Sequence, residues 1–236
     1  MSADRRLRPL LRAAMLVLAT AMTGGCVVTG VSPMIEAVRD SYRDDISKSM
    51  QRDLLRLRDI PYAQLYARFP DREEAVFLLA QQDPVLRQDL WIGSHGVSMT
   101  MQGPAIRSTS GLTTDIATGE PLQPGAVAQY LAGSGELRVG AQSVGWLQPA
   151  GSRNWIEQIG TVEQLQNVEY EGFAYTGPAL RITERVRTTG KPGSFQRRFW
   201  VEPRARALLR METRLLPDSG QIVLEWIRVP DRSDSR

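Results

Sequence analysis

The sequence is poor in the residues from which most enzyme sites and covalent cross-links are built. Its 236 residues include one cysteine, Cys26, and one histidine, His95. A single cysteine excludes an intrachain disulfide, and a single histidine leaves little from which to build a catalytic triad or a histidine-rich metal site. A phosphate-binding loop, a dinucleotide fingerprint and a nucleophile elbow are also absent from the sequence. We therefore expect no cofactor, no metal site and no catalytic residues.

Long hydrophobic runs are scarce as well. The apolar run at residues 13–22 is shorter than the roughly 20 residues that a transmembrane helix needs. Four arginines precede it, and Thr23, Gly24, Gly25 and Cys26 follow it. This order is typical of a secretory signal peptide. The alternatives are an ordinary signal peptide that ends near a free cysteine, and the lipobox of a bacterial lipoprotein, which the sequence resembles.

The lipobox resemblance implies cleavage after residue 25 and acylation of Cys26, palmitate included, so that Cys26 attaches the mature chain to a lipid bilayer. In the sorting rule of enterobacterial lipoproteins, an aspartate after the cysteine favours the inner membrane. Here that residue is Val27. By resemblance to that rule, we expect an outer-membrane lipoprotein whose body faces the periplasm.

The positive net charge comes from the expected leader. The chain has 29 basic and 26 acidic residues, and residues 1–25 hold four Arg and one Asp, which leaves 25 of each sign. The sequence pI of 9.3 is therefore no argument for nucleic-acid binding, and we expect no nucleic-acid partner. Charge is uneven along the remainder, which is acidic up to residue 180 and basic after it.

The residue pattern predicts one helix followed by many strands. An apolar stripe from Ile35 to Leu57 at helical spacing predicts an amphipathic helix. Strands are expected at residues 64–69, 75–80, 88–92, 97–102 and 105–110, a short helix at 126–131, and further strands at 155–159, 162–170, 179–188, 195–202, 207–216 and 222–229. Short turns between successive strands favour antiparallel meanders. The fold class is therefore mostly β, with meander sheets in a sandwich or barrel-like body.

The same pattern predicts the domain organisation. We expect a removed signal peptide (1–25), an anchor, tether and helix (26–60), a first β subdomain (61–117), a linker (118–136), a second β subdomain (137–230) and a polar tail (231–236).

Arginines gather on the predicted strands of the second β subdomain. Arg181, Arg185 and Arg187 alternate with Ile182, Glu184 and Val186, so the two sets face opposite sides of one strand. An arginine surface of this kind suits an anionic glycan or a protein partner. The alternative is a solvated face with cross-strand Arg–Glu pairs. The candidate residues for a glycan or partner face are Arg181, Arg185, Arg187, Arg197, Arg198, Trp200, Arg210 and Arg214.

Two segments resemble a known family. One is residues 60–116, with Trp91, Gly103, Arg107, Thr109, Gly111 and Leu112; the other begins at Phe199-Trp200-Val201-Glu202-Pro203 and continues through the last two strands. Together they are similar to the YjbF/GfcB-type lipoproteins of exopolysaccharide and group 4 capsule systems. The resemblance implies a mostly β outer-membrane lipoprotein. It also implies periplasmic and outer-membrane β-barrel partners in polysaccharide export.

Three functional hypotheses follow. The leading one is a non-catalytic accessory lipoprotein for exopolysaccharide or capsule export or assembly, which docks protein partners or anionic polysaccharide. The second is a lipid-handling outer-membrane lipoprotein, which requires a dry, apolar cavity. The third is a glycan-modifying enzyme, which requires two close carboxylates with shifted pKa values in a cleft.

Overall fold

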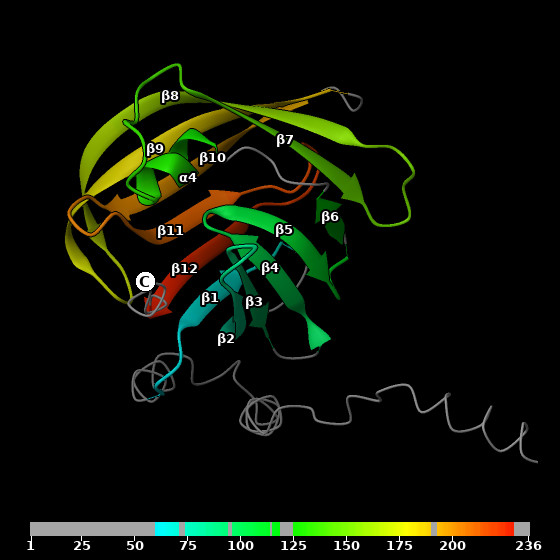
Figure 1. The fold of residues 1–236 in the computed structure, drawn as a ribbon, viewed down its shortest axis with the longest axis horizontal. Helices are drawn as coiled ribbons and strands as arrows, with labels where there is room; N and C mark the ends of the chain where they lie inside the picture. Colours follow the sequence, from blue (N-terminus) through cyan, green and yellow to red (C-terminus); the bar gives the residue numbers. More distant parts are fainter. Residues whose placement is uncertain are drawn as a thin grey trace, which may run out of the picture. The chain divides into compact units, whose positions relative to one another are not determined.

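The computed structural model describes residues 60–70, 74–93, 96–113, 115–118, 125–189 and 193–228. Within them the chain forms a closed barrel of twelve antiparallel strands, in which each strand pairs with its neighbours in sequence and β1 pairs with β12 (Figure 1). The first six are β1 (Gln64–Arg68), β2 (Ala75–Asp83), β3 (Gln88–Ile92), β4 (Ser98–Gln102), β5 (Ala105–Ser110) and β6 (Ile116–Thr118). After helix α4 (Ala126–Leu131) come β7 (Gln142–Pro149), β8 (Ile156–Glu171), β9 (Thr176–Thr188), β10 (Gly193–Glu202), β11 (Ala207–Thr213) and β12 (Ile222–Arg228).

The observed architecture confirms the mostly β meander expected from the sequence and resolves it as a barrel. The expected helix 126–131 is α4, and the expected strands 88–92 and 105–110 coincide with β3 and β5. The helix expected before residue 60 lies outside the described residues. No helix in the described ranges is long and apolar enough to span a membrane.

Three features differ from the sequence-based expectation. Segments 155–159 and 162–170 form one strand, β8, because a bulge between Val162 and Gln164 absorbs the break in alternation. Strands β6 and β7 were not expected, since β6 is short and β7 carries glycine and proline. The strands on either side of the expected linker also share one sheet, because β6 pairs with β7 and β1 with β12.

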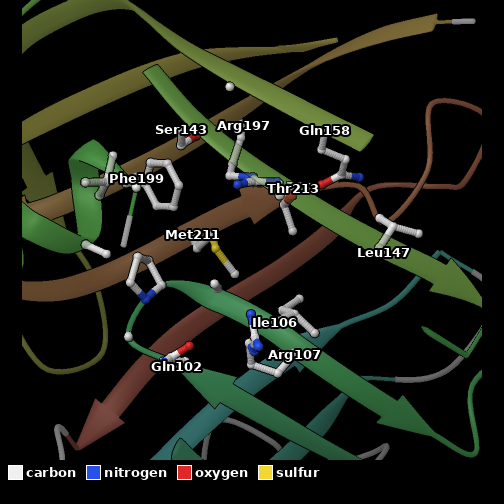
Figure 2. Close-up of a pocket in the computed structure, with 18 of the residues that line it drawn as sticks. Gln102, Ile106, Arg107, Ser143, Leu147, Gln158, Arg197, Phe199, Met211 and Thr213 are labelled. Carbon is white, nitrogen blue, oxygen red and sulfur yellow. Dashed lines mark hydrogen bonds between the residues drawn. The ribbon is translucent and has the colours of Figure 1, made fainter. Parts of the chain in front are cut away.

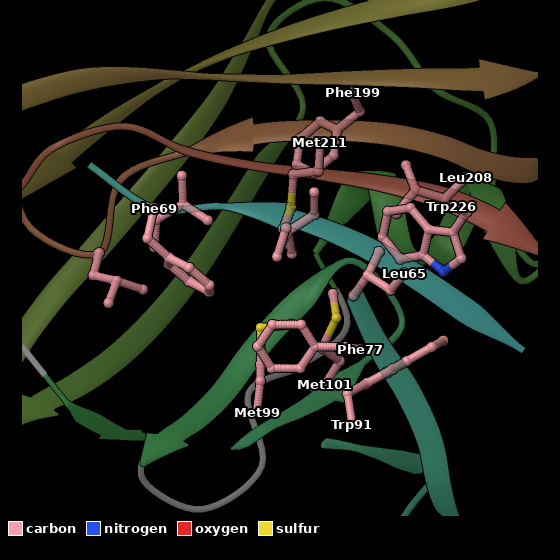
Figure 3. Close-up of a cluster of buried hydrophobic side chains, with 14 of the residues drawn as sticks. Leu65, Phe69, Phe77, Trp91, Met99, Met101, Phe199, Leu208, Met211 and Trp226 are labelled. Atoms are coloured by element: carbon pink, nitrogen blue, oxygen red, sulfur yellow. The ribbon is translucent and has the colours of Figure 1, made fainter. Parts of the chain in front are cut away.

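One part of the barrel interior is filled by large apolar side chains (Figure 3). Leu65 from β1, Phe77 from β2, Trp91 from β3, Met99 from β4 and Trp226 from β12 are all buried there. Each of these residues lies on the inward-facing side of its strand, because successive side chains in a strand point to opposite faces. The packed core fixes the strands that carry the rest of the barrel interior.

The tip of the β8–β9 hairpin packs against a second, smaller cluster. Phe173 at the tip lies edge-on to Tyr66 of β1, with ring centroids 5.3 Å apart. The buried carboxylate of Glu225 on β12 accepts hydrogen bonds from the Tyr170 hydroxyl (2.9 Å) and the Phe173 N–H (3.0 Å). Burial and the neighbouring Glu225 carboxylate raise the pKa of Tyr170, so its hydroxyl keeps its proton and remains a donor. Glu225 therefore joins the hairpin tip to the last strand.

Candidate functional site

A cavity of about 990 Å³ occupies the part of the barrel that the core does not fill (Figure 2). Its lining comes from every strand from β2 to β11, and α4 borders it. The volume is at the upper end of the range typical of small-molecule sites, roughly 300–1,000 Å³. Its lining is mixed, with apolar side chains beside charged and amide groups. The residues that carry the argument below are Arg107, Gln158, Glu184 and Arg197.

The cavity exists because β7 and β8 place small residues toward the interior. Ser143 pairs with Gly160 across the two strands, and Gly145 pairs with Gln158, so all four lie on one face. Leu147 and Ile156 continue this face into the buried core, which identifies it as the inner face. Ser143, Gly145 and Gly160 therefore leave room on the inner face of β7 and β8 and contribute to the hollow.

Glu184 and Arg197 form a cross-strand ion pair in the cavity wall. They are direct partners between β9 and β10, and Arg197 Nη1 lies 3.7 Å from Glu184 Oε2. The Glu184 side chain is 3% exposed and that of Arg197 is 21% exposed. Burial raises the pKa of Glu184, and the nearby guanidinium partly opposes that shift. Burial lowers the pKa of Arg197, while Glu184 opposes it.

Two further contacts hold Arg197 in place. Its Nε donates to Thr213 Oγ1 of β11 at 3.2 Å, and its Nη2 donates to Gln158 Oε1 of β8 at 3.4 Å. These bonds tie the guanidinium to strands on both sides of β9 and β10. Arg197 is therefore positioned by the barrel rather than by Glu184 alone.

Arg107 reaches the cavity from β5 because of a β-bulge. Thr100 pairs with Ser108 and Met101 with Ile106, so Arg107 is the extra residue between two register positions. A bulge redirects the side chain it carries, and Arg107 is only 8% exposed although it is charged. Figure 2 shows Arg107 and Arg197 on opposite walls of the cavity.

Helix α4 borders the cavity on its apolar side. Val127 is buried in the main core, and Leu131 packs against it. Arg206, in the turn after β10, donates to the Tyr130 carbonyl at 3.3 Å, and its guanidinium lies 5.1 Å from the Tyr130 ring centroid. These contacts hold the end of α4 against the barrel. The apolar side chains of α4 are therefore fixed beside the cavity.

Trp146 of β7 lies between the inward residues Gly145 and Leu147 and is 44% exposed, so its side chain is on the outer face of the strand. Its neighbour Val144 faces the same side and is also exposed. Trp146 therefore belongs to the outer surface of the barrel and not to the cavity.

The predicted arginine face divides between the two sides of the barrel. Arg197 faces the cavity, while Arg181, Arg185 and Arg187 lie on the opposite face of their sheet, as their alternation with Ile182, Glu184 and Val186 predicts. Arg185 pairs with Glu163 across β8 and β9, and Arg181 donates to Gln166. The sequence pattern therefore separated the two faces of β9 correctly.

The remaining predicted residues form a network on the outer face of β10 to β12. Glu212 accepts from Arg198 at 3.2 Å and from Arg210 at 2.7 Å, and Arg210 also lies 3.3 Å from Glu225. The Arg210 guanidinium lies 5.4 Å from the Trp200 ring centroid. Arg214 donates to the carbonyls of Pro217 and Ser219 in the next turn. Most of these arginines thus have partners within the barrel wall.

Some site residues were missed from the sequence. Glu184 carried a signal, since a carboxylate alternating with Ile182 and Val186 is expected on a core-facing side. Arg107 carried none, because a bulge positions it. Cys26 and His95 lie outside the described residues.

The small residues of the β7–β8 wall provide a direct test of the packing. A Cβ at Gly160 would lie 2.5 Å from Ser143 Oγ and 3.3 Å from Glu184 Oε2. We expect Gly160→Ala to lower the free energy of unfolding by about 1–3 kcal/mol, as overpacking does, in a urea titration. Adding Ser143→Gly should recover most of the loss. A double variant as unstable as the single one would contradict this packing.

The geometry also bears on two alternative functions. The lipid-handling hypothesis requires a dry, apolar cavity, yet Arg107, Glu184 and Arg197 line the one observed. The enzyme hypothesis requires paired carboxylates, and the partner that the structure gives Glu184 is a guanidinium. The arrangement is suited to holding a polar ligand by hydrogen bonds and charge.

The comparisons with known proteins agree with this architecture. The chain matches the family described as "Group 4 capsule polysaccharide lipoprotein gfcB, YjbF" over residues 48–227. No curated protein sequence matches it. The solved structure of the hypothetical lipoprotein YmcC from Escherichia coli K12 is similar in fold, with a TM-score of 0.61 and 12% identity, covering 78% of this chain and 94% of that one. The match over most of its length places the chain in the YjbF family of group 4 capsule polysaccharide lipoproteins.

Proposed function

We propose that the chain is an outer-membrane lipoprotein that acts as a non-catalytic accessory in the export or assembly of a capsule or exopolysaccharide. The family match over residues 48–227 carries this proposal, because it links the chain to capsule lipoproteins along most of its length. In this proposal Cys26 is the acylated first residue of the mature chain, and the barrel faces the periplasm. Its partners are periplasmic and outer-membrane β-barrel proteins of the export system.

The barrel geometry supports a binding role. Its interior holds a large cavity whose charged residues come from strands on opposite walls, Arg107 on β5 and Arg197 on β10. Glu184 is paired with Arg197 and is held in the wall, an arrangement that favours recognition over bond cleavage. The protein would then bind a partner or an anionic part of the glycan while the export machinery moves the polymer.

A clean deletion of the gene tests the role. We expect secreted polysaccharide to fall several-fold while the cell-associated polymer or its precursors stay at or above the wild-type level, because synthesis does not depend on an export accessory. Both pools are measured as total sugar in the medium and in the cells. Re-expression of the wild-type chain is the control, and unchanged secretion in the deletion strain would refute the proposal.

A Cys26→Ser variant tests the membrane anchor separately. Several buried acyl chains hold a protein at a bilayer, at about 0.8 kcal/mol for each buried methylene. Without the thiol we expect no lipid-modified N-terminus by mass spectrometry and export close to that of the deletion strain. A mature wild-type protein that begins elsewhere, or that carries no fatty acid, would remove Cys26 from the proposal.

A further inference from the structure

We propose that the barrel cavity binds a short carboxylated oligosaccharide, with Arg107 and Arg197 contacting the anionic sugar. The inference rests on the proposed function for the choice of a glycan, and the cavity itself supplies the chemistry. It moves the binding site from the outer arginine face to the interior of the barrel.

The donors in the cavity suit a carboxylate. Arg107 and Arg197 occupy facing walls, and each guanidinium is a planar fork that matches the two oxygens of a carboxylate. Arg197 is held from two sides by Thr213 and Gln158, so little side-chain entropy is lost when it meets a ligand. The position of Arg197 is therefore set before binding.

The Glu184–Arg197 pair keeps hydrogen-bonding capacity for a ligand. Their 3.7 Å separation exceeds the 2.7–3.2 Å range of a normal N–H···O bond. The charges attract each other without a direct hydrogen bond between these atoms. Glu184 can therefore accept from a sugar hydroxyl while Arg197 donates to another oxygen, and Gln158 adds an amide beside them.

Apolar side chains complete the lining of the cavity. Ile106 of β5 and Leu131 of α4 are partly buried there and present apolar surface to the faces of a sugar ring. A ligand with polar edges and apolar ring faces uses both kinds of wall.

A fatty acid fits the cavity less well. An acyl chain would have to lie against the charged groups of Glu184 and Arg197, and burying charges against hydrocarbon is unfavourable. A free phosphate would use the arginines but would leave the apolar wall without a contact. The mixed lining thus favours an acidic sugar.

Calorimetric titration of the full chain, expressed with its own leader and purified in detergent, tests this inference. The probes are a tetramer of galacturonic acid, a neutral glucose tetramer, sodium phosphate and oleate. We expect the galacturonate tetramer to bind at least about tenfold more tightly than each of the others, as charge-assisted hydrogen bonds allow. Equal or tighter binding of the glucose tetramer, phosphate or oleate, or no binding of the acidic tetramer, would overturn the proposal.

Matched variants locate the site. Arg107→Gln removes a charge inside the cavity, and Arg187→Gln makes the same change on the outer face. We expect about a tenfold or greater loss of galacturonate affinity for Arg107→Gln and less than about a twofold change for Arg187→Gln. Equal effects of the two arginine variants would overturn the assignment.

Complementation separates this inference from the proposed function. A deletion strain expressing Arg107→Gln should export less polysaccharide than one expressing Arg187→Gln at the same protein level. Full export with Arg107→Gln would refute glycan binding in the cavity as the basis of the role and leave the accessory role standing. Galacturonate binding by a chain whose deletion does not alter export would refute the accessory role and leave the binding site standing.

Discussion

Replacing Arg197 with Leu is expected to lower the free energy of unfolding by about 3 kcal/mol at neutral pH, because removal of one partner leaves the other charge buried without compensation. The Glu184 side chain, at 3% exposure, would lose the guanidinium 3.7 Å away. Thr213 and Gln158 would also lose a donor. The loss is measured by urea unfolding of the variant and the wild type.

The loss in Arg197→Leu should depend on pH. Burial holds the pKa of Glu184 above its ordinary value, and Arg197 opposes that shift, so the variant raises the pKa of Glu184 further. Between the unfolded and folded pKa values the folded state then binds more protons than the unfolded state, and stability falls as pH rises. We expect a larger deficit at pH 8 than at pH 5. A deficit that shrinks with rising pH would contradict this.

Two controls separate the buried pair from charge loss in general. Arg198→Leu removes the next arginine, which faces outward toward Glu212 at 3.2 Å, and should cost no more than about 1 kcal/mol. Glu184→Gln combined with Arg197→Leu removes the uncompensated charge and should recover part of the stability and most of the added pH dependence. If Arg198→Leu costs as much as Arg197→Leu, the burial argument is wrong.

Replacing Glu225 with Ala is expected to lower the free energy of unfolding by about 3–4 kcal/mol, as when a buried, multiply bonded charge is removed. Its carboxylate accepts from the Tyr170 hydroxyl, the Phe173 N–H and Arg210 Nη1 at 2.9, 3.0 and 3.3 Å. All three donors would lose their acceptor. Because Phe173 and Tyr170 are at one end of the β8–β9 hairpin, we also expect faster amide hydrogen exchange there than in the β1–β3 core.

Tyr170→Phe is the matched control for this prediction. It removes one of the three hydrogen bonds to Glu225 and keeps the aromatic ring, so it should cost about 1 kcal/mol. A Glu225→Ala variant no less stable than Tyr170→Phe, with unchanged exchange at Phe173, would show that the hairpin tip is held by the Tyr66–Phe173 contact instead.

The sequence determined the local structure well wherever alternation was clear. The strands around Ile182, Glu184 and Val186 follow their hydrophobic period, and so do the two faces of β9, because successive side chains in a strand point to opposite sides. The short helix at 126–131 and the turns between strands were also predicted from local composition. Meander topology follows from short connections, since these join neighbouring antiparallel strands.

Only the tertiary structure decided how the sheet closes and what its interior holds. Whether β1 pairs with β12 depends on strand tilt and stagger around the whole barrel, which no local pattern specifies. The inward position of Arg107 depends on a bulge between β4 and β5. The cavity depends on Gly145 and Gly160 lying on the inner face of the paired strands β7 and β8. Both features depend on how strands pair with one another, which the pattern within a single strand does not specify. The resemblance to a lipobox around Cys26, by contrast, is a local pattern that the sequence carries by itself.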